Sequence, residues 1–168
     1  LALKWWLGEV ICAGSRCPEK TADGRQCSET LDHWGDHAVC CPTGPSRIAR
    51  HDMVNYAWMN ILHSSGFNVR REVNVAPGTT QRRSADTYVF DWANGEPAAH
   101  DWVVTSTTNK QARSLPRADA DWALLEAEKK KVTKDDGLCE MHGVTLVPLA
   151  ADTFCGFAPE AKCAITRT

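Results

Sequence analysis

Hydrophobic and polar residues follow two different periods along this chain, one near 3.6 residues and one of two residues. In residues 46–65 the apolar side chains recur at the spacing of one helical face. They are Ile48, Val54, Ala57, Trp58, Ile61 and Leu62. Ser46 can cap this segment and Gly66 can end it. The pattern therefore predicts an amphipathic helix over residues 46–65.

Three later stretches alternate apolar and polar positions, as half-buried β-strands do. A turn at Pro77-Gly78 separates the first two, and a turn around Asn94-Gly95 is typical of a hairpin between the second and the third. The three stretches are residues 67–76, 82–93 and 98–107. We expect three neighbouring strands of one sheet.

The C-terminal part of the chain returns to a helical pattern. Residues 115–143 predict a helix that stops at Gly143, and the apolar run 144–151 indicates a buried strand. The order of helix, three strands, helix and strand predicts an α/β fold in which helices flank a sheet. A Pro/Gly-rich joint at 41–46 separates these elements from a turn-rich N-terminal segment, so we expect two parts, residues 1–45 and 46–168.

Cysteine use distinguishes the N-terminal segment. The chain has eight cysteines in 168 residues, five of them within the first 41. A disulfide scaffold is usually shorter, secreted and evenly cross-linked. Clustered cysteines beside histidines favour instead a metal site in a reducing intracellular compartment. A redox protein is less well supported, because the chain has no C-x-x-C motif and Cys40 adjoins Cys41.

Four donors in this segment have the spacing C-x9-C-x9-H-x3-C. They are Cys17, Cys27, His37 and Cys41. Zinc takes four nitrogen or sulfur donors in a tetrahedron, and four protein ligands leave no open position, so a zinc ion here would be structural. Cys40 and His33 are competing ligands. The alternative is a group of reduced cysteines that pack as small hydrophobic residues beside a surface histidine.

The net charge of −2 and the pI near 6.3 exclude a uniformly basic nucleic-acid coat protein, but not a local basic face. No stretch of 18 apolar residues exists, so we expect no membrane-spanning helix. The apolar start contains Lys4 and Glu9 and lacks the basic region of a signal peptide. It also lacks an initiator Met, so we expect a piece of a longer protein.

Carboxylates and lysines in the second part suggest phosphodiester chemistry. Asp86 lies in the second predicted strand, Asp101 in the third, and Lys129–Lys131 on the next helix. Two carboxylates at neighbouring strand ends can hold Mg²⁺, which polarises a phosphate and acidifies a bound water. A nearby lysine can stabilise the developing charge, and Glu72 can add a carboxylate. The alternative is a set of solvated surface groups.

Seven segments spread over nearly the whole chain support a more specific hypothesis. They are LKWWLGEVICAGSRCP, LDHWGDHAVCC, RHD, RRSADTYV, AAHDWVVTS, EAEKKK and CEMHGVTLVPL. In this order they resemble the C-terminal region of non-LTR retrotransposon proteins, in which a CCHC zinc knuckle precedes a restriction-like PD-(D/E)xK endonuclease domain. The resemblance implies a restriction-endonuclease-like sheet flanked by helices over residues 46–168, with the knuckle in residues 1–45.

The resemblance also implies roles for single residues. Asp86 and Asp101 would bind Mg²⁺ or Mn²⁺, and Lys129, aligned by counting back from Cys139, would be the displaced catalytic lysine. Lys130 and Lys131 remain alternatives for that role. The four zinc donors would be those of the N-terminal cluster, Cys17, Cys27, His37 and Cys41.

A second group would be accessory or contact nucleic acid. Its members are Arg50, His51, Arg82, Arg83 and Lys130. For Arg50 and His51 the choice stays open between contacting DNA, bracing the site and forming an ordinary surface pair. Two departures from the family pattern stand out: Ser84-Ala85 precede Asp86 where the family has a proline, and Val103 stands two residues after Asp101 where a lysine is expected.

Two functions are compatible with these patterns. The first is a DNA endonuclease of a nuclear retrotransposon protein, which nicks target DNA so that the exposed 3′ end primes an upstream reverse transcriptase. Its partner is DNA, with RNA as an alternative. The second is a domesticated descendant without cleavage that binds nucleic acid or serves as a subunit of a larger assembly. The acidic net charge and the seven tryptophans favour this second reading modestly.

Overall fold

The structure is a computed structural model that describes residues 4, 7, 9–12, 14–76, 78, 85–107 and 121–168. The predicted order of helix, three strands, helix and strand is confirmed, and a short helix follows at the end. The named elements are α2 (Asp36–Cys40), α3 (Ser46–Ser64), β1 (Val69–Val73), β2 (Ala85–Ala93), β3 (Glu96–Thr105), α5 (Trp122–Met141), β4 (Thr145–Asp152) and α6 (Pro159–Thr166).

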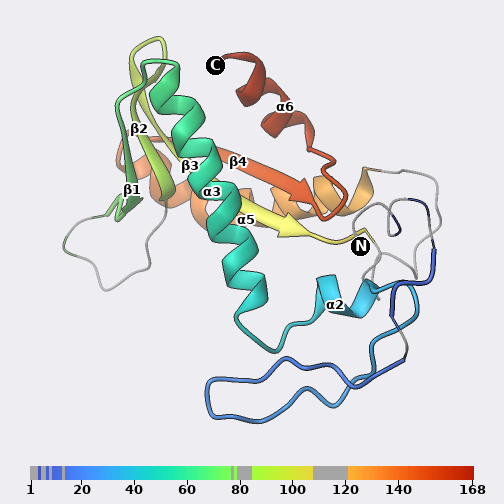
Figure 1. The fold of residues 1–168 in the computed structure, drawn as a ribbon. Helices are drawn as coiled ribbons and strands as arrows, with labels where there is room; N and C mark the ends of the chain where they lie inside the picture. The colour runs from blue at the N-terminus through green and yellow to red at the C-terminus, as the bar shows by residue number, and fades with distance from the viewer. Residues whose placement is uncertain are drawn as a thin grey trace.

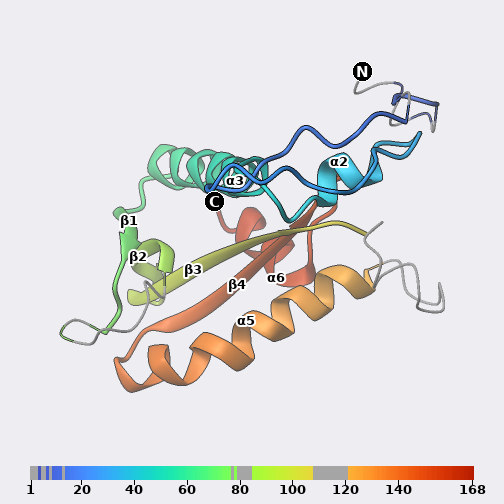
Figure 2. The same ribbon diagram turned by 90° about the horizontal axis from the view of Figure 1, so that it is seen from below.

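The four strands form one mixed sheet in the order β1-β2-β3-β4. The first three strands run antiparallel, whereas β4 pairs in parallel with β3 after the crossover through α5. Helices α3 and α6 cover one face of the sheet and α5 covers the other, as Figures 1 and 2 show. The chain is therefore an α/β protein with a mixed sheet flanked by helices, preceded by a Cys/His-rich segment.

The hairpin between β2 and β3 forms as predicted. Asn94 and Gly95 both have positive φ, at 58° and 79°, which is the backbone conformation of the tight turns that join antiparallel strands. Beyond an irregularity in the pairing between Val89 and Ala93, the two strands pair in the register that places Thr87 opposite His100 and Tyr88 opposite Ala99. The same register controls which residues face each other at the far end of the hairpin.

Two details of the sequence prediction differ from the structure, and two predicted element starts cannot be compared with it. Ser46 does not cap α3: it is the first residue of the helix, and its hydroxyl donates instead to the Glu19 carboxylate. Helix α6 was not predicted, because it is only eight residues long and buries small side chains, Ala161 and Ala164. The predicted starts at residues 82–84 and 115–120 lie outside the described residues. No helix in the described part is long and apolar enough to span a membrane.

The core between the sheet and α3 contains a buried polar pair. Trp58 of α3 and His100 of β3 are almost fully buried, and the Trp58 Nε1–H donates to His100 Nδ1 at 2.9 Å. Burial lowers the pKa of His100 to about 3. The neutral imidazole is thus the form that this core holds.

This burial predicts a loss of stability in mild acid. The unfolded chain binds a proton at His100 with a pKa of about 6.5, so the contribution of His100 is complete above that pH and falls as the pH drops toward about 3. Between pH 7.5 and pH 5.5 the expected loss from this residue is about 1.4 kcal/mol. Urea unfolding of the wild type and of His100→Asn, which keeps an acceptor for Trp58, measures it. An equal loss in both proteins would contradict the prediction.

Candidate functional site

The N-terminal segment brings its four predicted donors together. The ligand atoms of Cys17, Cys27, His37 and Cys41 all lie within 4.8 Å of one another. Cys17 Sγ is 3.7 Å from Cys41 Sγ, and Cys27 Sγ is 3.5 Å from His37 Nε2. A tetrahedral zinc ion with bonds of about 2.3 Å to sulfur and 2.0 Å to nitrogen separates two sulfurs by about 3.8 Å, and a sulfur from a nitrogen by about 3.5 Å. The group can therefore hold a metal ion such as zinc.

Local hydrogen bonds position these donors. Antiparallel bridges join Arg16 to Thr30 and Lys20 to Gln26, so Cys17 and Cys27 lie on a hairpin-like loop. The Asp32 carboxylate accepts from the backbone amide of His37 at 2.7 Å and so fixes the start of α2. Burial raises the pKa of Asp32, but hydrogen bonds from the backbone amides of His37 and its neighbours outweigh burial and lower the pKa.

The competing ligands do not join the cluster. Cys40 and His33 are both described, and neither belongs to the group of four. Inside it the two thiols of the loop differ: burial raises the pKa of Cys17 to about 11, whereas a hydrogen bond from the Glu29 backbone lowers the pKa of Cys27 to about 7. A bound cation would stabilise both as thiolates.

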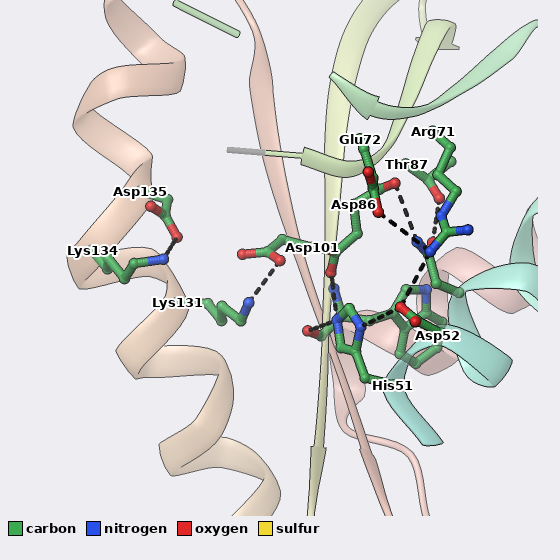
Figure 3. Close-up of polar contacts among 12 residues, drawn as sticks. His51, Asp52, Arg71, Glu72, Asp86, Thr87, Asp101, Lys131, Lys134 and Asp135 are labelled. Carbon is green, nitrogen blue, oxygen red and sulfur yellow. Dashed lines mark hydrogen bonds and ion pairs between the residues drawn. The ribbon is translucent and has the colours of Figure 1, made fainter. Parts of the chain in front are cut away.

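The two predicted carboxylates meet at the open end of the β2–β3 hairpin. Because Thr87 pairs with His100, continuing the register by one residue places Asp86 opposite Asp101. Figure 3 shows their carboxyl groups between α5 on one side and α3 on the other. Asp101 is almost fully buried. The sequence positions therefore converge as predicted, although the two side chains were 15 residues apart in the chain.

His51 and the backbone of β3 hold Asp86 in place. Asp86 Oδ2 lies 2.9 Å from His51 Nε2 and accepts from the Trp102 amide at 2.8 Å. The hydrogen bond to Asp86 raises the pKa of His51 despite its partial burial. Burial raises the pKa of Asp86, but His51, the hydrogen bond with Asp101 and the Lys131 charge together outweigh it, so the pKa is lowered. Asp86 is thus held as a carboxylate, and of the three alternatives left open for His51 this contact fits bracing of the site.

Asp101, the other member of the pair, has a raised pKa where that of Asp86 is lowered. Burial and the neighbouring Asp86 carboxylate raise the pKa of Asp101 to about 7, while the Lys131 ammonium opposes the rise. Lys131 Nζ lies 2.6 Å from Asp101 Oδ1. Two facing acidic groups beside one amine are an arrangement in which an added cation relieves repulsion.

The lysine that contacts Asp101 is Lys131, whereas the sequence analysis preferred Lys129. Lys129 and Lys130 are exposed, and among the described residues the lysine amine that pairs with Asp101 is that of Lys131. Counting back from Cys139 located the right turn of α5 but did not show which lysine of that turn faces the sheet. Leu124, Lys131 and Cys139 are spaced by seven and eight residues, which puts all three on the face of α5 that meets the sheet.

Asn55 is a site residue that the sequence analysis missed. Its side chain is buried, its Nδ2 donates to the Asp86 backbone carbonyl at 3.2 Å, and its Oδ1 accepts from the Thr87 hydroxyl. His51 and Asn55 continue the buried face of Trp58 toward the start of α3. Polar residues on an otherwise apolar helical face were the signal that could have found it.

Glu72 lies on β1, across from the Asp86 end of β2. Its φ of 51° breaks the regular strand, and its carboxylate is 3.3 Å from Arg71. Arg71 also reaches Asp52 of α3 at 3.2 Å. Figure 3 shows this group beside Asp86. The extra carboxylate is thus near the pair, held by an arginine of its own strand.

The predicted arginines do not contact the carboxylate pair in the described part of the chain. Arg50 points back to the Cys/His segment, where its Nη2 donates to the Val39 carbonyl at 2.8 Å. It therefore connects α3 to α2, which bears His37 and ends next to Cys41. Arg82 and Arg83 lie outside the described residues.

A cavity of about 340 Å³, here called the site opening, is lined in part by the side chains that contact Asp86 and Asp101, His51 and Lys131. Its lining consists of Arg47, Ile48, His51, Trp102, Val103, Val104 and Lys131. The walls come from α3, α5 and the stretch of β3 that extends beyond the end of β2. Reagents in solution can thus approach the two groups that contact Asp86 and Asp101. Comparisons with protein-family models, with curated proteins and with solved structures found no match.

Proposed function

We propose that residues 46–168 are a restriction-like endonuclease domain that nicks DNA with the help of a divalent cation. One observation carries the proposal: Asp86 and Asp101 face each other across the end of a hairpin, with the Lys131 amine 2.6 Å from Asp101. The topology supports it, because the carboxylates come from adjacent central strands and the lysine from the helix that follows them. The resemblance to retrotransposon endonucleases predicts the same pair of acids.

The donor set suits Mg²⁺ or Mn²⁺. Both ions prefer oxygen ligands and commonly use one or two carboxylates together with water and substrate phosphate. Asp86 Oδ2 contacts His51 and the Trp102 amide, and Asp101 Oδ1 contacts Lys131. The two carboxyl groups also hydrogen-bond to each other, so a divalent ion bound between them would replace that contact. The Trp102 carbonyl, 3.2 Å from His51 Nε2, is a third oxygen at the same place.

Each side chain has a role in this chemistry. A divalent ion held by Asp86 and Asp101 would offset phosphate charge and make a water a better nucleophile. Lys131 stabilises the negative charge that grows on the phosphate as the bond breaks. His51, Asn55 and the Trp102 amide keep Asp86 ionised and aimed. No proton transfer needs to be assigned to these positioning groups.

Cations around the opening supply attraction for a nucleic-acid backbone. Arg47 is exposed and lines the opening, and Lys130 and Lys134 flank Lys131 along α5, with Lys134 also paired to Asp135. Phosphate contacts of this kind give most of the sequence-independent affinity of DNA-binding proteins. These cations give a local basic face next to the carboxylates, although the whole chain is slightly acidic.

The Cys/His cluster completes the proposal as a structural zinc knuckle. Four protein donors leave no open position for substrate, so the ion would stabilise its segment and not take part in cleavage. Through Arg50 and Val39 this segment is attached to the helix that presents His51. In the parent protein the nick would supply a 3′ end for reverse transcription in the nucleus.

Replacing one carboxylate tests the activity. Asp101→Asn keeps the size of the side chain but removes the charge that a divalent ion needs, so we expect nicking of supercoiled plasmid to fall by more than about 100-fold. Asp91→Asn, an exposed residue of β2, is the matched control and should nick as the wild type does. Gel analysis with Mg²⁺ and with Mn²⁺ measures both rates. Equal activity of the two variants would contradict the assignment of the site.

A further inference from the structure

A second cavity lies beside the candidate site, between α5 and β3. It has a volume of about 330 Å³, and we call it the α5 hollow. Val103 and Thr105 of β3 line one side, and Trp122 and Ala127 of α5 line the other. Residues on alternate positions of a strand share a face, so Val103 and Thr105 lie on the same side of the sheet as Asp101. The α5 hollow therefore extends from the carboxylate pair along β3.

The α5 hollow and the site opening share two lining residues, Val103 and Lys131. Val103 is two residues from Asp101, a distance of about 6.6 Å along a strand. If a nucleic-acid strand places one phosphate beside Lys131, the nucleotide next to that phosphate lies at the entrance of the α5 hollow. The cavity is continuous with the site and close enough for a single nucleotide step.

Its lining matches the parts of a nucleotide. The floor is apolar, and the half-buried Trp122 offers an aromatic wall on which a base can stack. Lys130, Lys131 and Lys134 lie on the rim, where a phosphate would sit, and Glu126 supplies a hydrogen-bond acceptor. The volume is at the lower end of the range for pockets that hold small ligands, about 300 to 1,000 Å³.

We propose that the α5 hollow binds one unpaired nucleotide of the substrate strand, next to the phosphate that is cleaved. The inference rests on the proposed endonuclease and adds the class of its substrate. A base inside a double helix is stacked and paired on both sides, so it enters such a cavity only after leaving the stack. DNA that is single-stranded or locally open at the nicking position is therefore preferred over continuous duplex.

Binding of oligonucleotides to the full chain tests this preference. A single-stranded DNA that carries a 2-aminopurine reporter is compared with its duplex, without added divalent metal so that no strand is cut. Trp122→Ala removes the stacking surface, and we expect the affinity for the single strand to fall roughly tenfold. The affinity for the duplex should change by less than about twofold, since its bases remain paired.

Two adjacent lysines provide a control that does not depend on a large aromatic side chain. Lys130 lines the α5 hollow, whereas Lys129 is exposed and does not. Lys130→Ala should weaken single-strand binding several-fold through the lost phosphate contact, and Lys129→Ala should bind as the wild type does. Circular dichroism and thermal unfolding establish that each variant is folded.

The outcomes separate the two proposals. Equal effects of Lys129→Ala and Lys130→Ala, or single-strand binding that folded Trp122→Ala retains in full, would overturn the nucleotide site even if the wild type nicks DNA. A wild type that shows the Trp122-dependent preference but nicks no DNA with Mg²⁺ or Mn²⁺ would overturn the activity and leave the nucleotide site standing.

Discussion

Lys131→Ala is expected to nick supercoiled plasmid about 100- to 1,000-fold more slowly than the wild type. The amine of Lys131 is 2.6 Å from Asp101 and is the cation placed to stabilise charge on a phosphate held between the two carboxylates. Removing one preorganised group of this kind from a transition state typically has an effect of that size. The measurement is the initial rate of relaxed-circle formation at fixed Mg²⁺.

Lys129→Ala is the matched control for this prediction. It removes the same charge from the same helix, two residues away, but from a side chain that is exposed. A general loss of electrostatic attraction to DNA would affect both variants alike, whereas a role at the site affects Lys131 alone. Full activity in Lys131→Ala together with lost activity in Lys129→Ala would contradict the structural assignment and favour the alignment from Cys139.

Loss of the cluster metal should have the second large effect, and it concerns stability. Structural zinc contributes apparent binding free energies of about 10 to 16 kcal/mol in small zinc-finger peptides, where binding and folding occur together. Cys17→Ser removes a buried ligand of the cluster. We expect this variant to lose its bound zinc and to become sensitive to protease within residues 16–41, while the β-sheet remains resistant.

Cys40→Ser is the control that distinguishes a zinc ligand from a cysteine that only lies next to one. Cys40 adjoins Cys41 in the sequence but does not belong to the group of four donors. The variant should therefore keep one equivalent of zinc, measured by elemental analysis, and the protease pattern of the wild type. Zinc retained by Cys17→Ser, or lost equally from both variants, would show that the four donors have been wrongly chosen.

The elements of the fold were predictable because their patterns are local. The helix at 46–65 ends at Ser64, and the hairpin turn at Asn94-Gly95 forms where it was expected. The hairpin brings Asp86 and Asp101 onto neighbouring strands, but their facing also depends on the shift in pairing between Val89 and Ala93, which the turn does not specify. Short α6 was missed because small residues such as Ala161 give a weak periodic signal.

Contacts between distant elements were beyond the reach of the sequence patterns. The choice of Lys131 over Lys129 depends on the phase of α5 against the sheet, which a count of residues does not give. Arg50 was grouped with His51, yet one reaches Val39 and the other Asp86. The raised pKa of Asp101 likewise comes from burial and from Asp86, both of which exist only in the folded chain.

The most direct test of the endonuclease is plasmid nicking by the zinc-loaded wild type and by Asp86→Asn, followed by extension of the nick with a DNA polymerase. The proposed endonuclease activity predicts relaxed circles from the wild type only with Mg²⁺ or Mn²⁺, ends that the polymerase extends, and no product above background from the variant. Nicking by Asp86→Asn at the wild-type rate, or none by folded wild type with either ion, would contradict it.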